Sequence, residues 1–160
     1  MEQTYIWPLA NGFQTGTMVR IRGAIPPGGK SSSSSFNINF QNKDDYNTSD
    51  VILHVSVRYS QGFIALNTKD SGKWMSEVRL NTTAVTAGRE FEILIACEQK
   101  DFRIAINGVH FADFPMRRAH TLIKALTVIG EVIVNTVSFE TSRPGPPNAA
   151  NLGTSYPFSR

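Results

Sequence analysis

The sequence predicts an all-β fold, an antiparallel sandwich or barrel, and three observations support this. Apolar and polar residues alternate along many short runs, which is the period of a half-buried strand. These runs are rich in Val, Ile, Phe and Thr and are separated by Gly, Asn, Asp and Ser, which favour turns. No segment has the i, i+3, i+4 spacing of a long amphipathic helix. Many short strands with almost no helix imply two packed antiparallel sheets or a closed barrel.

The alternating runs define the expected strands. In chain order they are Thr17–Gly23, Phe36–Gln41, Asp50–Tyr59, Gly62–Thr68, Glu77–Leu80, Glu90–Glu98, Asp101–Ile106, Val109–Pro115, Leu122–Gly130 and Glu131–Phe139. Asn107 and Gly108 predict a two-residue hairpin turn, because both tolerate positive φ. Trp74 lies between a polar turn and a strand that carries Glu77 and Arg79, whereas Trp7 has no such polar neighbours in the sequence. Trp7 is therefore expected to pack at a sheet edge.

The length of 160 residues is that of one domain with a tail. The strand pattern stops after Phe139, and a segment rich in Pro, Gly and Asn follows over Arg143–Asn148. We therefore predict one domain over residues 1–142 and an extended, mobile tail or linker over residues 143–160.

The composition excludes several classes of function. Sixteen Lys and Arg against thirteen Asp and Glu give a net charge of only +3, and the basic residues are scattered, so no nucleic-acid partner is expected. No apolar run approaches eighteen residues, so no membrane insertion is expected. No signal peptide is expected, because the first residues lack a basic segment followed by an apolar stretch, and a single cysteine, Cys97, suits a reducing compartment such as the cytoplasm. The strand around Cys97 favours a half-buried structural thiol over a nucleophile.

One strand carries the most informative pattern. Along Asp50–Tyr59, Leu53, Val55 and Val57 point to one face of the sheet, and His54, Ser56 and Arg58 point to the other. The three apolar residues are expected in the core, which leaves three polar side chains in a row on the opposite face.

The following strands extend this polar face. In the next strand Ile64 and Leu66 belong with the core, while Asn67 shares the face of His54. A polar turn over Thr68–Lys73 then leads to Trp74, Glu77 and Arg79, of which the last two again share a face. A flat indole beside many hydrogen-bond donors and acceptors suits a sugar, which has an apolar C–H face and a rim of hydroxyl groups.

This set of residues resembles the signature of a known family. The pattern His54-x-Ser56-x-Arg58, then Asn67, then Trp74-x-x-Glu77-x-Arg79 is similar to the galectin motif H-x-N-x-R, N, W-x-x-E-x-R. The similarity continues through about residues 4–140. It implies a two-sheet jelly-roll β-sandwich that binds β-galactosides of the lactose or N-acetyllactosamine type, without metal or cofactor, on a concave sheet. It also implies secretion without a signal peptide, and it leaves open a second lectin domain in tandem or a homodimer.

The resemblance also implies a role for each residue. Trp74 would stack on galactose, His54 and Arg58 would bind its axial 4-hydroxyl, and Asn67 and Glu77 its 6-hydroxyl. Arg58, Glu77 and Arg79 would reach the 3-hydroxyl of the following sugar. Ser56 departs from the usual Asn, and its shorter hydroxyl predicts an affinity lower by about two- to tenfold.

The sequence also bears on two other classes of function. Glycoside hydrolysis needs two facing carboxyl groups, whereas the predicted face carries only Glu77, whose pKa the neighbouring arginines should lower. A nucleophilic pair of Cys97 and His54 is not expected, because their strands differ. A galectin-type domain that binds protein after weakening or losing glycan binding remains the alternative, since Val57 and Met75 also depart from the family pattern. Retention of both Trp74 and Glu77 favours glycan binding.

Overall fold

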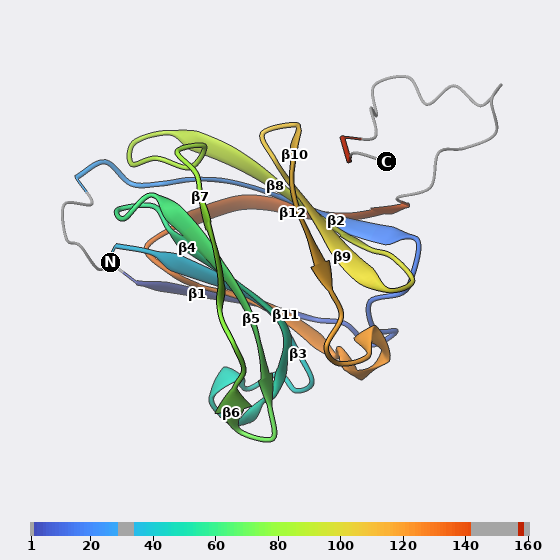
Figure 1. The fold of residues 1–160 in the computed structure, drawn as a ribbon. Helices are drawn as coiled ribbons and strands as arrows, with labels where there is room; N and C mark the ends of the chain where they lie inside the picture. Colours follow the sequence, from blue (N-terminus) through green and yellow to red (C-terminus); the bar gives the residue numbers. More distant parts are fainter. Residues whose placement is uncertain (1, 29–33, 142–156, 159–160) are drawn as a thin grey trace, which may run out of the picture.

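The computed structural model describes residues 2–28, 34–141 and 157–158, and most of them form two antiparallel sheets packed face to face (Figure 1). One sheet has the order β1-β11-β3-β4-β5-β6, with β7 also pairing with β5, and the other has the order β10-β9-β8-β2-β12. The predicted sandwich, of the jelly-roll type that the resemblance implied, is confirmed. The strands are β1 (Gln3–Pro8), β2 (Thr17–Ala24), β3 (Phe36–Gln41), β4 (Val51–Arg58), β5 (Phe63–Asp70), β6 (Lys73–Trp74), β7 (Val78–Asn81), β8 (Glu90–Cys97), β9 (Asp101–Ile106), β10 (Val109–Pro115), β11 (Ala125–Gly130) and β12 (Ile133–Thr141).

Each predicted strand overlaps an observed one, but two observed strands were not predicted. The polar turn expected over Thr68–Lys73 is shorter than the sequence indicated, because β5 continues to Asp70 and β6 starts at Lys73. Only Ser71 and Gly72 form the turn, with φ of 53° and 81°. The other addition is β1, which pairs with β11 at the edge of the seven-stranded sheet. Trp7 lies on this edge strand, as predicted, and stacks on Tyr5 with ring centroids 6.0 Å apart.

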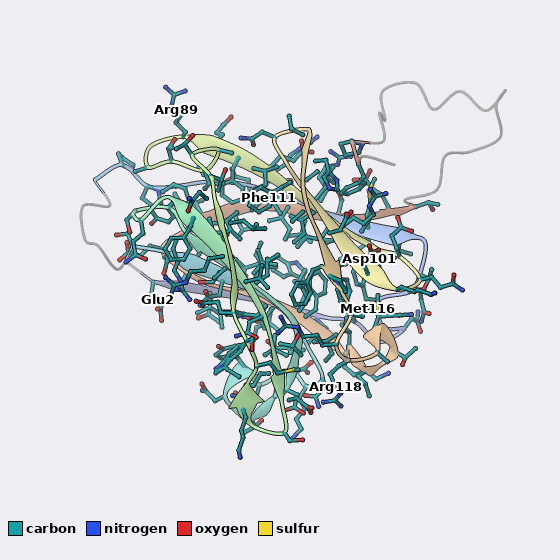
Figure 2. The ribbon with its side chains drawn as sticks, in the orientation of Figure 1. Glu2, Arg89, Asp101, Phe111, Met116 and Arg118 are labelled. Carbon is teal, nitrogen blue, oxygen red and sulfur yellow. The ribbon has the colours of Figure 1, made fainter. Side chains whose placement is uncertain are left out.

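The core lies between the two sheets, where side chains fill the space (Figure 2). Alternation places the predicted residues of β4 and β5 inward, and all of them are at most 1% exposed. These residues are Leu53, Val55, Val57, Ile64 and Leu66. The facing sheet contributes alternate residues of β2, β8 and β9. Each fully buried Leu, Ile or Val adds about 1.5–3 kcal/mol of transfer free energy, so this core fixes β4 and β5 in place.

The single thiol lies deeper than predicted. Cys97 is 0% exposed rather than half-buried, because its side chain points into the core from β8. Burial raises the pKa of the Cys97 thiol to about 12. The thiol is therefore protonated at neutral pH. It lies on a different strand from His54, as the sequence indicated, and that strand belongs to the opposite sheet.

Two turns depend on residues that accept positive φ. Asn107 and Gly108 have φ of 51° and 80° and join β9 to β10, which confirms the predicted hairpin. Gly130 ends β11 with φ of 139°, and a Cβ there would lie 2.5 Å from the Cα of Phe36. Only glycine therefore fits where β11 meets the start of β3.

The predicted domain boundary at residue 142 stays a prediction. The tail segment Arg143–Asn148 lies outside the described residues. Near the C-terminus the structure describes Pro157 and Phe158, and Phe158 is buried against the five-stranded sheet.

Candidate functional site

Strand register brings the predicted site residues together on the face of the seven-stranded sheet that points away from the core. His54 on β4 lies opposite Asn67 on β5, and Ser56 lies opposite Ala65, which in turn pairs with Arg79 on β7. His54, Ser56 and Asn67 border a groove of about 430 Å³, whereas the predicted site residue Arg79 is not among the residues that line it. Its lining residues are Ser35, Asn37, Tyr46, His54, Ser56, Arg58, Asn67, Trp74 and Glu77.

The carboxylate of Glu77 is held by two arginines. Arg58 donates from Nη2 to Oε1 at 2.7 Å, and Arg79 donates from Nε to Oε2 at 2.6 Å. The hydrogen bond from Arg79, with the charge of Arg58, holds the pKa of Glu77 below its usual value despite partial burial. The lowering predicted from the sequence is thus confirmed. An ionised carboxylate with one bond on each oxygen keeps further lone pairs for a ligand.

Arg58 is itself fixed by two more neighbours. Its Nε donates to Ser56 Oγ at 3.1 Å, and its guanidinium lies 5.2 Å from the ring centroid of Phe63. The guanidinium of Arg79 lies 4.7 Å from the same ring. Phe63 therefore contacts both arginines that bind Glu77 through cation–π interactions. We call Glu77, Arg58 and Arg79 the Glu77 clamp. Phe63 is not among the site residues that the sequence predicted.

His54 is only 8% exposed and is neutral at physiological pH. Burial, together with the positive charge of Arg58, lowers the pKa of His54 to about 4. Its Nδ1 lies 2.6 Å from the Oδ1 of Asn39 on β3. An amide oxygen only accepts, so Nδ1 carries the hydrogen and Nε2 is left as an acceptor.

The amide of Asn67 is anchored on three sides. Its Nδ2 donates to Met75 O at 2.9 Å, and its Oδ1 accepts from Thr68 N at 2.7 Å and from Arg117 Nη1 at 3.1 Å. Arg117 also donates to Ser76 O at 2.8 Å, so it ties the β6–β7 connection to β5. One hydrogen on Asn67 Nδ2 remains for a ligand. The sequence gave no role to Arg117, which lies fifty residues away along the chain.

Trp74 forms one wall of the groove and keeps much of its surface open. Its side chain is 43% exposed, and its ring centroid lies 4.5 Å from that of His54 at an interplanar angle of 53°. Lys69 Nζ lies 5.8 Å from the same ring. The exposed indole therefore offers an apolar surface beside the polar groups of β4 and β5.

The part of the chain that the structure describes shows no group of three or more His, Cys, Asp and Glu arranged to hold a metal ion. Within those same residues, no helix is long and apolar enough to cross a membrane.

Comparison with known proteins assigns the family. The model of the galactoside-binding lectins matches residues 4–139, which is most of the chain. The chain belongs to the galectin family. This galectin is 30% identical over 129 residues to the 32 kDa beta-galactoside-binding lectin of Haemonchus contortus, covering 80% of this chain and 45% of that protein. It is 28% identical over 130 residues to galectin-7 of Rattus norvegicus, covering 81% of this chain and 92% of that one.

A second 32 kDa beta-galactoside-binding lectin, from Caenorhabditis elegans, is 28% identical and covers 95% of this chain and 53% of that protein. The galectin thus spans about half the length of the two 32 kDa relatives it matches. Solved structures with the same fold include human galectin-16 carrying two substitutions, with a TM-score of 0.77 at 21% identity over 86% of this chain and 94% of that chain. Sheep galectin-11 in complex with glycerol has a TM-score of 0.75 at 20% identity, covering 84% of this chain and 96% of that chain. Membership of this family supports a lectin function.

Proposed function

We propose that the chain binds β-galactosides of the lactose or N-acetyllactosamine type in the groove on β4, β5 and β6, without breaking a bond. The observation that carries this proposal is the exposed indole of Trp74 beside a fixed array of His54, Arg58 and Glu77. A pyranose needs one apolar platform for its C–H face and directional partners for its hydroxyl groups. Among the described residues that line the groove, Glu77 is the one carboxyl group, which gives no acid–base pair for hydrolysis.

The protonation state of His54 suits recognition of a hydroxyl group. Neutral Nε2 accepts a hydrogen bond, and the adjacent Arg58 only donates. A hydroxyl group does both, so the axial 4-hydroxyl of galactose would donate to His54 and accept from Arg58. In glucose the inverted 4-hydroxyl would leave both groups without this partner, at a cost of about 1–3 kcal/mol at buried His54 and less at Arg58, which is partly exposed.

The neighbouring groups suit the remaining hydroxyls in the same way. Asn67 has one amide hydrogen left, and ionised Glu77 accepts, so the two would bind the 6-hydroxyl. The Glu77 clamp, with Arg58 and Arg79, would face the 3-hydroxyl of the second sugar. Because the arginines already hold the carboxylate, little side-chain entropy remains to be lost on binding.

The open groove implies weak single-site binding. One stacking platform and a few hydrogen bonds favour a Kd of ~0.1–1 mM for lactose. Firm attachment to a glycan-covered surface would then need several linked sites, through a second lectin domain in tandem or a homodimer. Sedimentation of the purified protein distinguishes a monomer from a dimer. Retention on dense and sparse galactoside surfaces then tests whether avidity contributes.

The test of glycan binding is retention on a lactose-coupled resin. The wild type is expected to be retained, to elute with lactose but not with sucrose, and to lose retention in Trp74→Ala. Trp7→Phe on edge strand β1 is the matched control and should be retained like the wild type. A wild type that flows through at low salt while its far-ultraviolet circular dichroism shows a folded sandwich would overturn the proposal.

A further inference from the structure

A second apolar cluster lies on the face of the five-stranded sheet that points away from the core. Phe158 is 4% exposed and packs there on four side chains from β2, β8 and β9. We call these four the outer socket: Met18, Leu94, Ala96 and Ala105. Figure 1 shows the short red C-terminal segment beside this sheet, on the side away from the seven-stranded sheet.

The strand register shapes the outer socket. Met18 pairs with Ala96, and Leu94 pairs with Ala105, so two small residues alternate with two large ones across three strands. The alanine methyl groups leave space above β8 and β9, and Met18 and Leu94 border that space. With Phe158 in place, all four side chains are at most 4% exposed, although they face away from the core. An aromatic ring therefore completes the burial of this patch.

Polar neighbours make the outer socket suited to an aromatic ring. The guanidinium of Arg103 lies 5.6 Å from the ring centroid of Phe158, and the ring of His110 meets it edge-on at 6.1 Å and 87°. Asp113 lies 3.0 Å from Arg103 Nε and 3.4 Å from His110 Nε2, so it orders both neighbours. An aliphatic side chain would keep the apolar contact but lose both ring interactions.

We propose that the outer socket is a docking site for the chain's own C-terminal segment, with Phe158 as the residue that anchors it in solution. The docked segment covers an apolar patch on the sheet opposite to the proposed sugar groove. The proposal is independent of glycan binding.

Chain connectivity favours docking within one molecule. Glu140 on β12 pairs with Met18, so the chain leaves the sheet beside the outer socket. The sequence places sixteen residues between Thr141 and Phe158. A connection of this length gives an effective concentration on the order of millimolar. At micromolar protein, a second copy of the segment is far more dilute and competes poorly.

Proton NMR of the full chain tests the proposal. A ring above Ala96 and Ala105 moves their methyl resonances upfield, and Phe158→Ala should abolish this shift. Phe139→Ala is the matched control, because Phe139 is 45% exposed and outside the cluster. A peptide of residues 153–160 should restore the upfield shifts in Phe158→Ala, and its version with alanine in place of phenylalanine should not. Wild type should bind this peptide on the order of tenfold more weakly, because its own segment occupies the site.

Two outcomes would overturn the proposal. Methyl shifts of Ala96 and Ala105 that are the same in wild type and Phe158→Ala would show that the ring does not dock in solution. Upfield shifts that decline on tenfold dilution of the wild type would show that a second copy supplies the segment. Retention on the lactose resin is expected to be unchanged in Phe158→Ala, so a failure here is separate from a failure of the proposed function.

Discussion

The Nδ1 atom of His54 lies 2.6 Å from the Oδ1 atom of Asn39, and this contact decides which ring nitrogen faces the groove. Asn39 Nδ2 donates to Thr127 Oγ1 at 3.1 Å, and Thr127 donates to Gln41 Oε1 at 2.7 Å. Gln41 Nε2 ends the chain by donating to Lys43 O at 2.9 Å. Every bond has one direction only, so the backbone at Lys43 fixes the tautomer of His54 through three buried side chains.

The pH dependence of lactose binding should follow His54. Its pKa falls from 6.5 to about 4 on folding, so the imidazole stays neutral from pH 7 to about pH 5. Protonation of Nε2 below that range removes the acceptor, and affinity should fall as pH falls through about 4. Glu77, whose pKa is lowered, stays ionised over most of this range. Calorimetric titration with lactose from pH 7 to about pH 3 measures the midpoint. A midpoint near 6.5 would contradict the assignment.

Asn39→Ala should weaken lactose binding by about tenfold while the sandwich still folds. The change removes the acceptor for His54 Nδ1, so both tautomers become populated and the oriented Nε2 acceptor is partly lost, at about 1–1.5 kcal/mol. Asn39→Asp keeps an acceptor and adds a negative charge beside His54. It should therefore raise the pH midpoint of binding, an effect that a purely structural role for Asn39 would not produce.

Glu77→Gln should lower lactose affinity by about 10- to 100-fold with a change in unfolding free energy of no more than about 1 kcal/mol. The carboxylate accepts from both Arg58 and Arg79, and hydrogen bonds to charged groups contribute about 1.5–3 kcal/mol. The pair is partly exposed, so its effect on stability is small. Asp113→Asn, which removes an arginine partner on the other sheet, is the control and should bind lactose as the wild type does. Equal affinities of Glu77→Gln and wild type would contradict the proposed role.

Alternation predicted most of the strands and the face on which His54, Ser56 and Arg58 lie, because both depend on the order of residues within one strand. Their assignment to a sugar site stays a prediction. Alternation missed β1 and β6 for different reasons. Strand β1 pairs with β11 alone and has no fully buried side chain, so the alternation of apolar and polar residues along it is weak. Strand β6 has two residues, and it pairs only because Ser71 and Gly72 both adopt positive φ.

The supports of the site were harder to predict because they depend on pairing between distant strands. Asn39 reaches His54 only through the β3–β4 register, and Arg117 reaches Asn67 from beyond β10. A signal for Asn39 was present, since Phe36, Ile38 and Phe40 point to the core and leave the residues between them on the polar face. The sequence contained no comparable signal for Phe158 or Arg117.

Cys97 should be inert to thiol reagents in the folded protein. It is 0% exposed, and burial raises the pKa of its thiol to about 12, so almost no thiolate forms at pH 8. Alkylation by iodoacetamide, followed by mass spectrometry, should be negligible in buffer and complete in denaturant. Rapid alkylation of the native protein would show that β8 opens locally.

Ser56→Asn should tighten lactose binding by about two- to tenfold. Ser56 Oγ accepts from Arg58 Nε at 3.1 Å, and an asparagine oxygen is able to keep this role while its amide group adds donors toward the groove. One added hydrogen bond is worth about 0.5–1.5 kcal/mol. Ser56→Ala is the matched comparison, and it should bind more weakly than wild type because Arg58 loses its acceptor. Calorimetry with lactose ranks the three proteins. Tighter binding by Ser56→Ala than by Ser56→Asn would mean that space at this position, rather than hydrogen bonding to Arg58, limits the affinity.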